Sequence, residues 1–332
     1  MAVRQLVNDP DDFVREALEG LQRVHPDLIR YHEHPAYVIR AQQSDKVALV
    51  SGGGSGHEPL HTGFVGTGML DAAVPGAVFA SPTAYQVRRA ISAADRGRGV
   101  LLIVKNYTGD VLNFRIAAEL AAEDGIQVRT VLVDDDLATD GQEDGAPGRR
   151  GTAAVVAVEK ICGAAAENGA SLDEVAALGE RVVSSARTMA LALAPCTQPG
   201  HDKPSFDLPD GEIEFGVGIH GEHGIGRRPY APVRELVADL TKPIVAALGL
   251  DRGDQVIAIV NGLGSTHGLE LSVVHRELSV FLEDLGVRVG RALVGSYVTA
   301  LDMRGCSITL LRADEELLAL WDSPVATPAL TW

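Results

Sequence analysis

The sequence predicts an α/β protein built from two α/β domains with mixed, largely parallel sheets. Buried-type strand segments alternate along the chain with helical segments, which is the pattern of βαβ units. The 332 residues exceed the usual size of one domain and suggest two. Hydrophobic residues make up 46% and charged residues 22%, which are ordinary globular values and exclude a disordered or fibrous chain.

The first half of the chain predicts an opening helix followed by strand–helix units. Asp9-Pro10 precedes apolar residues at helical spacing, which predicts a capped amphipathic helix through Leu21. Short apolar runs indicate buried strands, and Ser81-Pro82 marks a helix start. The expected strands are 46–50, 100–104 and 128–133. The expected helices are 81–94, 111–122, 152–168 and 172–193, with a polar, glycine-rich loop at 134–151.

A proline-rich stretch separates the two expected domains. Residues 194–209 contain four prolines and few periodic apolar residues, so we expect a linker there. The N-terminal α/β domain then covers 1–193, and the C-terminal α/β domain covers 210–314. The tail 315–332 is expected to pack back on the first domain, because its two tryptophans are too apolar for a free end. The remaining expected strands are 212–219, 255–260, 287–294 and 307–311, and the remaining helices are 233–248, 269–285 and 315–321.

Charge and cysteine usage exclude several classes of protein. Lys plus Arg number 29 and Asp plus Glu 45, so the formal charge is −16 and binding to nucleic acid or an anionic membrane is not expected. The three cysteines form no C-x-x-C pair, which argues against a disulfide framework or a cysteine zinc site. The N-terminus lacks an apolar signal-peptide core, and no apolar run is long enough to span a membrane. A cytoplasmic location is expected.

Several catalytic and binding motifs are absent or incomplete. No Gly-Lys-Ser or Gly-Lys-Thr completes a Walker A loop, and H-E-x-x-H does not occur. A serine-hydrolase elbow fails because His57 stands where G-x-S-x-G needs its last glycine. Residues 216–221 match G-x-G-x-x-G after a strand, but glycines and a proline prevent the helix that a dinucleotide site needs. His32 and His34 flank Glu33 near a proline and favour a solvated turn, so no metal is expected.

The first candidate site is the glycine run after the strand at 46–50. Gly52 to Gly54, with Ser55 and Gly56, let the backbone approach a ligand and present several N–H groups. A plain tight turn would explain the glycines equally well. His57 favours a functional interpretation, because a titratable ring beside exposed backbone N–H groups suits proton transfer.

Two further polar loops follow predicted strands, where α/β sheets bind ligands. Asp110 follows the strand at 100–104 and could be a general base or the cap of the next helix. Lys105 could donate a hydrogen bond to a ligand or be a solvated charge. His220 is followed by Gly221, so a core role is not expected, and an exposed loop histidine is the alternative.

Six motifs resemble the dihydroxyacetone kinase family, specifically its ketose-binding K subunit. They occur in the family's order over nearly the whole chain, which makes the resemblance far more specific than any single glycine pattern. The motifs are Ser51–Pro59 (SGGGSGHEP), Asn106–Phe114 (NYTGDVLNF), Gly218–Glu222 (GIHGE), Asn261–Gly264 (NGLG), Leu301–Leu311 (LDMRGCSITLL) and Leu318–Trp332.

The resemblance implies a role for each candidate residue. His220 corresponds to the histidine that adds to the substrate carbonyl and forms a hemiaminal. Asp110 is then the general base, and His57 assists with the proton of the hydroxyl that is phosphorylated. Gly54, Ser55, Gly56 and Lys105 contact the substrate, which is dihydroxyacetone or a similar short ketose. A neutral imidazole can add reversibly to a carbonyl carbon, which glycerol lacks, so such a site would reject polyols by chemistry.

The resemblance also implies partners, because no nucleotide site is recognisable in this chain. ATP, or ADP with Mg²⁺, is expected in a separate nucleotide-binding L-type subunit, and no cofactor is expected in this chain. A phosphotransferase-system relay protein could supply the phosphate instead of ATP, and the sequence leaves both donors open. A homodimer and a place in glycerol metabolism are further implications of the family.

Alternatives remain within and beyond the family. His223 stands where the family usually has proline, and Thr266-His267 stands for Thr-Pro, which leaves the exact ketose open and makes erythrulose an alternative substrate. A non-catalytic ketose-sensing regulator on the same scaffold is a second alternative, although Asp110 and His57 argue against it. A dinucleotide-dependent oxidoreductase is supported only by residues 216–221.

Overall fold

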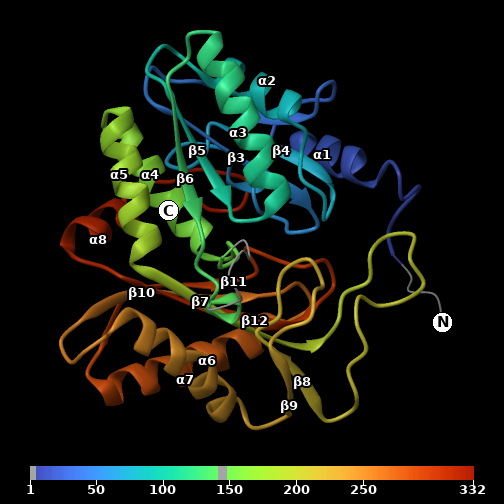
Figure 1. Cartoon of the computed structure of the whole chain (residues 1–332), viewed down its shortest axis with the longest axis vertical. Helices are drawn as coiled ribbons and strands as arrows, with labels where there is room; N and C mark the ends of the chain where they lie inside the picture. The colour runs from blue at the N-terminus through green and yellow to red at the C-terminus, as the bar shows by residue number, and fades with distance from the viewer. Residues whose placement is uncertain (1–4, 141–147) are drawn as a thin grey trace. The chain divides into compact units, whose positions relative to one another are not determined.

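The structure is a computed structural model that describes residues 5–140 and 148–332 (Figure 1). The chain folds into two compact units, which are described separately below. The first unit comprises residues 5–133, 155–182 and 320–332, and the second comprises the described residues of 134–154 and 183–319. Part of the loop expected at 134–151, residues 141–147, lies outside the described residues. Among the described residues, no helix combines the length and apolarity needed to span a membrane.

The first unit contains a mixed sheet of six strands in the order β1-β2-β4-β3-β5-β6. The run β4-β3-β5-β6 is parallel, whereas β1 and β2 pair antiparallel with each other and β2 pairs antiparallel with β4. The strands are β1 (Ile29–His32), β2 (Tyr37–Arg40), β3 (Ala48–Ser55), β4 (Ala72–Val78), β5 (Val100–Lys105) and β6 (Val128–Val133).

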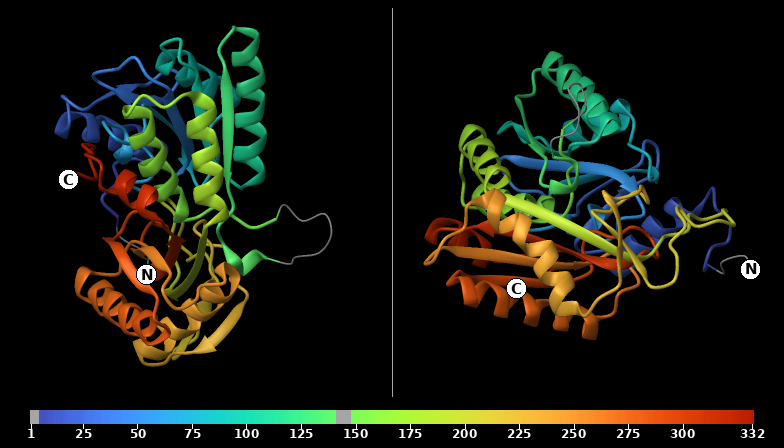
Figure 2. Two further views of the ribbon diagram at one scale, coloured as in Figure 1. Left: turned by 90° about the vertical axis from the view of Figure 1, so that its left-hand side faces the viewer. Right: turned by 60° about the horizontal axis from the view of Figure 1, so that its bottom comes forward.

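Helices lie on both faces of this sheet, as a parallel arrangement requires. Helices α2 (Ala84–Ala94) and α3 (Thr108–Glu123) cover one face and bury an apolar cluster of aliphatic side chains around Phe114. Helices α4 (Ala154–Glu167) and α5 (Leu172–Ser184) lie on the other face (Figure 2). Strands β3 and β5 are therefore covered on both faces, and all their residues are buried. The opening helix α1 (Phe13–Val24) confirms the first predicted helix.

The second unit contains the other six-stranded sheet, in the order β11-β10-β12-β7-β8-β9. Only β10 and β11 pair in parallel, and the other four pairs are antiparallel. Helices α6 (Val233–Leu248) and α7 (Gly268–Leu285) pack on this sheet and close its apolar core. The strands are β7 (Ala186–Ala194), β8 (Glu212–Phe215), β9 (Gly226–Pro229), β10 (Gln255–Gly262), β11 (Arg288–Gly295) and β12 (Arg304–Arg312). The predicted α/β class with mixed sheets is confirmed, although the largely parallel character belongs to the first sheet.

The structure corrects the helix predicted over 172–193. Helix α5 ends at Ser184, and residues 186–194 form β7 in the middle of the second sheet. Alanine, leucine and methionine favour helices in isolation. Here β12 and β8 supply backbone partners on both sides of β7, and the strand is largely buried. Tertiary pairing thus overrides local propensity.

The division of the chain also differs from the expected one. Residues 194–209, expected as the linker, lie within the second unit, whose sheet already includes β7. The tail behaves as expected from about residue 320 onward, since Thr67 and Ala326 form a β-bridge within the first unit. Helix α8 (Glu315–Asp322) leads into this tail, and Lys160 of α4 donates a hydrogen bond to the Leu320 carbonyl at 2.9 Å.

Candidate active site

The glycine run belongs to strand β3. The prediction that it forms a loop after a strand at 46–50 is therefore wrong. Gly52, Gly53 and Gly54 are buried, and this end of β3 pairs with β4, whereas β5 pairs only with residues 48–51 of β3. A Cβ on Gly52 would lie 2.4 Å from the Val74 carbonyl oxygen, and one on Gly54 would lie 2.7 Å from the Ala80 amide nitrogen. Glycine is therefore required so that neighbouring backbone can approach the carboxyl end of β3.

Lys105 is the last residue of β5 and is completely buried. Its Nζ lies 2.8 Å from His61 Nε2, 3.4 Å from the Gly52 carbonyl oxygen and 3.8 Å from Asp110 Oδ2. Burial lowers the pKa of Lys105, while the nearby carboxylates of Asp110 and Glu159 raise it. The alternative of a solvated surface charge is excluded, because Lys105 is an interior group at the sheet end where α/β proteins bind ligands.

Asp110 lies in the first turn of α3 and is 3% exposed. The N-cap of α3 is Tyr107, so Asp110 does not have the capping role that was one of its two predicted alternatives. Its Oδ2 faces Lys105, and its buried Oδ1 has no hydrogen-bond partner in the described part of the chain. The start of a helix favours a negative charge, so the fold holds a buried carboxylate there with one unpartnered oxygen.

His57 and the residues before it form the turn that leaves β3. Its ring is buried and stacks on Phe79, with centroids 5.2 Å apart and planes inclined by 21°. Gly56 has φ of 101°, a conformation that favours glycine, and its N–H donates to the Glu58 carboxylate at 2.9 Å. The Ser55 hydroxyl donates to the Gly76 carbonyl at 2.7 Å. A substrate contact by Ser55 would therefore use a hydroxyl lone pair or the backbone.

Three buried polar residues behind Lys105 were not singled out from the sequence. His61 Nδ1 lies 2.6 Å from Glu159 Oε1 and 3.0 Å from Ser51 Oγ. Burial lowers the pKa of His61 well below its usual value, and the charges of Lys105 and His57 act in the same direction. Burial raises the pKa of Glu159 to about 8, against the opposing effect of Lys105. Burying polar groups without partners costs free energy, so a histidine and a glutamate within apolar segments are a sequence signal for a buried polar contact. The sequence around His61 does not show, however, that its partner lies on α4.

His220 belongs to the second unit, in the loop after β8. Gly221 adopts φ of 78°, and the His220 backbone N–H donates to Glu222 Oε2 at 2.7 Å. The other carboxylate oxygen of Glu222 lies 4.0 Å from His220 Nδ1 and 3.2 Å from Arg150 Nη1. Arg150 also donates to the Gly216 carbonyl at 3.0 Å, so two side chains order the His220 loop. The His220 side chain is partly exposed at 23%.

The remaining sequence candidates have simpler environments. β8 ends at Phe215 and is followed by β9 without an intervening helix, so residues 216–221 lack the helix start of a dinucleotide site. His223 is 62% exposed and lies 3.6 Å from Glu214. His34 is exposed and lies 3.5 Å from Glu33. Within residues 5–140 and 148–332, no group of three or more His, Cys, Asp or Glu is arranged to hold a metal ion.

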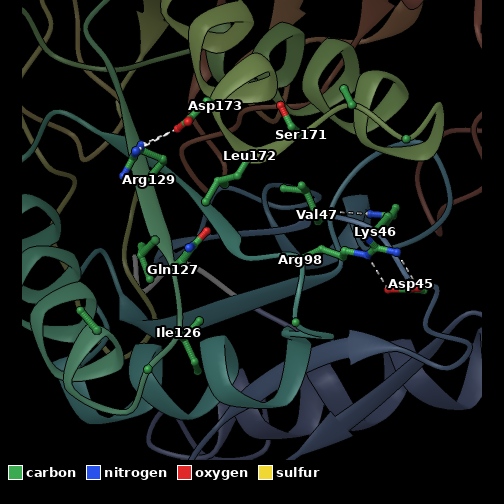
Figure 3. Close-up of a pocket in the computed structure, with 16 residues that line it drawn as sticks. Asp45, Lys46, Val47, Arg98, Ile126, Gln127, Arg129, Ser171, Leu172 and Asp173 are labelled. Carbon is green, nitrogen blue, oxygen red and sulfur yellow. Dashed lines mark hydrogen bonds and ion pairs between the residues drawn. The ribbon is translucent and has the colours of Figure 1, made fainter.

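The first unit thus brings most of the predicted site residues to one sheet end. Gly54 and Ser55 end β3 and are followed by Gly56 and His57, while Lys105 ends the neighbouring β5 and Asp110 lies five residues later in α3. A cavity of about 920 Å³ lies at the opposite, amino ends of β3, β5 and β6 (Figure 3). Its arginines are paired, Arg98 with Asp45 and Arg129 with Asp173. None of the predicted site residues lines that cavity, so we do not identify it as the candidate active site despite its volume.

Known proteins similar to this chain identify its family. The model of the Dak1 domain matches residues 19–329. The dihydroxyacetone-binding subunit of the PEP-dependent dihydroxyacetone kinase of Escherichia coli K12 is 46% identical, over 99% of both chains. The dihydroxyacetone kinase operon co-activator DhaQ superposes with a TM-score of 0.89 at 34% identity, over 95% of this chain and 96% of that one. The dihydroxyacetone kinase of C. freundii gives 0.89 at 35% identity, over 99% of this chain and 60% of that one. The chain therefore belongs to the Dak1-domain family, the dihydroxyacetone kinase family that its motifs indicated.

Proposed function

We propose that this chain is the ketose-binding subunit of a dihydroxyacetone kinase. The observation that supports the proposal most directly is the buried pair at the end of β5, where Asp110 keeps one oxygen without a partner beside the Lys105 amine. A carboxylate in that position can accept a hydroxyl proton, and an amine can donate to a substrate oxygen. The E. coli relative, at 46% identity, carries the name of a dihydroxyacetone-binding subunit.

In the proposed reaction, His220 first captures the ketose. A ring nitrogen bonds to the carbonyl carbon, the carbonyl oxygen takes a proton, and the ring loses one, so the hemiaminal forms without a leaving group. Glu222 lies next to Nδ1 and supports addition through Nε2. The captured ketose cannot rotate freely, which makes the later transfer a positioned step.

Phosphoryl transfer then uses the groups of the first unit. Asp110, assisted by His57, accepts the proton of the terminal hydroxyl as its oxygen bonds to phosphorus and the donor's bond to phosphorus breaks. Reversal of the addition then breaks the C–N bond to His220, returns the hydroxyl proton to the ring and releases dihydroxyacetone phosphate. Such transfer needs mainly positioning and charge stabilisation, and Lys105 supplies a positive group beside the reacting oxygen. Gly54, Ser55 and Gly56 line the same end of β3 and support the substrate through their backbone.

The phosphoryl donor is proposed to come from a partner subunit. An L-type subunit would bring ATP, or ADP with Mg²⁺ that a phosphotransferase relay protein recharges. The E. coli relative is named as part of a PEP-dependent kinase, which favours the relay. Mixing the chain with each type of partner and each donor, and measuring ketose phosphate, decides between them. Light scattering tests the homodimer expected from the family.

Two experiments test the chemistry of the site. Dihydroxyacetone labelled with ¹³C at its carbonyl carbon should show that carbon as tetrahedral when bound to the wild-type chain. His220→Ala should abolish this signal, and His201→Ala, an exposed histidine of the same unit, should retain it. Asp110→Asn should keep the adduct but lower turnover about 10²–10⁴-fold, the usual contribution of a general base. An unattached ketone carbon in the wild-type complex would contradict the capture by His220, and full turnover of Asp110→Asn would remove Asp110 as the base.

A regulatory role is the second candidate function, because the similar structure DhaQ is named a co-activator. A sensor would bind ketose but transfer no phosphate with any partner, so the same turnover assay separates the two functions. Running the assay with erythrulose beside dihydroxyacetone determines the preferred ketose, which His223 and His267 leave open.

A further inference from the structure

A line of buried polar groups runs from the sheet end into the protein behind Lys105. Ser51 of β3, His61 before the short helix η1 (Thr62–Phe64) and Glu159 of α4 form this line. His61 is 4% exposed, and Ser51 and Glu159 are completely buried. No role in the proposed reaction has so far been given to these three residues. A buried polar network is stable only when each donor is paired with an acceptor. This requirement allows the hydrogen atoms of the network to be assigned.

The hydrogen bonds define which ring nitrogen of His61 carries the hydrogen. The Ser51 hydroxyl donates its only hydrogen to the Ile103 carbonyl at 2.7 Å, so toward His61 it can only accept. His61 Nδ1 lies 3.0 Å from this oxygen and 2.6 Å from Glu159 Oε1. Both neighbours can therefore accept a hydrogen from Nδ1, because a protonated Glu159 can carry its own hydrogen on Oε2 and leave Oε1 as the acceptor. A neutral ring with its hydrogen on Nδ1 has a lone pair on Nε2.

That lone pair points to the Lys105 amine. The Nζ to Nε2 distance is 2.8 Å, and an ammonium can only donate. His61 is consequently the strong acceptor for Lys105, since the Gly52 carbonyl lies farther away at 3.4 Å and Asp110 Oδ2 at 3.8 Å. The end of the lysine is held against Gly53, where a Cβ would approach Nζ to 2.6 Å. His61 thus takes one N–H of Lys105, and the Gly52 carbonyl and Asp110 Oδ2 are the more distant neighbours of the amine.

We propose that His61 is a positioning residue for Lys105: its ring, oriented by Ser51 and Glu159, holds the lysine as an ammonium beside Asp110. This inference rests on the proposed function, because it gives His61 a purpose only if Lys105 acts on the ketose. His61 does not touch the reacting atoms and acts through Lys105.

The charges around Lys105 determine the direction of the pH effect. Asp110 on α3 and Glu159 on α4 both favour the ammonium, and His57 acts on the His61 ring. Burial opposes the ammonium, and a neutral acceptor at 2.8 Å offsets part of that penalty. Removing the acceptor should therefore lower the pKa of Lys105 and convert it to the amine at a lower pH.

Nitrogen NMR of the wild-type chain tests the assignment without any activity. With ¹⁵N-labelled histidine, His61 should appear as a neutral ring with its hydrogen on Nδ1, and it should not titrate through the range of ordinary histidines. A hydrogen on Nε2, or a protonated ring in that range, would overturn the proposal. The resonance is identified as the one lost in His61→Gln.

Kinetics of two variants test the positioning role. His61→Leu removes the acceptor, whereas the amide of His61→Gln can still accept from Lys105. We expect kcat of His61→Leu to fall by up to about 10²-fold, because misplacing a functional group by about 1 Å can cost that factor, with a smaller change in KM. In a plot of kcat against pH, the alkaline limb of His61→Leu should move to lower pH. His61→Gln should recover part of both effects, and His34→Gln, an exposed histidine of the same unit, should match the wild type.

The possible results separate this inference from the proposed function. A wild-type kcat and pH profile in a folded His61→Leu would overturn the positioning role while leaving the kinase intact. If wild type phosphorylates no ketose with any partner, the proposed function fails, and the NMR tautomer still tests the His61 assignment. If His61→Leu does not fold, the kinetics of His61→Gln test the positioning role instead. In that case, an Nδ1 hydrogen in the wild type together with partial activity and a shifted alkaline limb in His61→Gln supports the role. A folded His61→Gln with the kcat and pH profile of the wild type would overturn it.

Discussion

Gly53 is the position where the smallest change should disturb the proposed site most directly. A Cβ placed there would lie 2.6 Å from Lys105 Nζ, 3.4 Å from Asp110 Oδ2 and 3.7 Å from His61 Nε2. The backbone at Gly53 does not have a positive φ, so alanine meets no conformational barrier and its effect is steric. In Gly53→Ala the added methyl must push the lysine amine away from its place.

The size of the effect follows from the lack of free space. Lys105 is fully buried and held by His61, so its amine cannot swing into solvent to make room. Misplacing a functional group by about 1 Å can cost about 10²-fold in rate. We therefore expect turnover of Gly53→Ala with the partner subunit to fall by about that factor. Overpacking should also lower the free energy of unfolding by about 1–3 kcal/mol.

The assay for Gly53→Ala combines turnover, ketose binding and denaturant unfolding, with Gly20→Ala as the matched control. Gly20 lies in α1, and a Cβ there meets nothing within 4 Å. Replacing a glycine inside a helix by alanine should stabilise the chain by about 0.5–1 kcal/mol, and activity should stay unchanged. Wild-type turnover in Gly53→Ala would refute the reasoning, because it would mean that the position of the Lys105 amine does not matter.

Two further predictions concern stability. Asp71→Asn should lower the free energy of unfolding by about 3–5 kcal/mol, because buried Asp71 accepts from Arg40 at 2.9 Å and from Lys46 at 2.5 Å. Asp45→Asn, which removes only an exposed ion pair, should cost about 0–1 kcal/mol, and equal losses in urea unfolding would contradict this account. The pKa of Glu159 is raised to about 8 from an ordinary 4.5, so the folded chain binds more protons than the unfolded chain between these values. Its contribution to stability should therefore fall as pH rises through this window and be retained at the acid end, and unfolding of Glu159→Gln across that window should show a weaker decline than wild type.

Much of the first half of the proposed site could be predicted from the sequence, because its signals are local. The glycines before His57 and the polar residues after the apolar run at 100–104 stand at strand ends, which parallel sheets place side by side. What could not be predicted was that Gly52 to Gly54 continue β3. That extension depends on pairing with β4, a strand that shows no clear signal in the sequence.

The motifs, the α/β class and the strand ends near His57, Lys105 and Asp110 are properties of the sequence, since short-range spacing and glycine content determine them. The strand predicted over 212–219 ends at Phe215 instead, so His220 lies farther along the loop after β8. The tertiary structure decided the strand β7, whose residues have helical propensity but whose backbone partners are distant in the chain. It also decided the contact of His61 with Glu159, 98 residues later. The reason is the same in both cases: the free energy of a buried polar or backbone group depends on its partner, and only the folded chain supplies that partner.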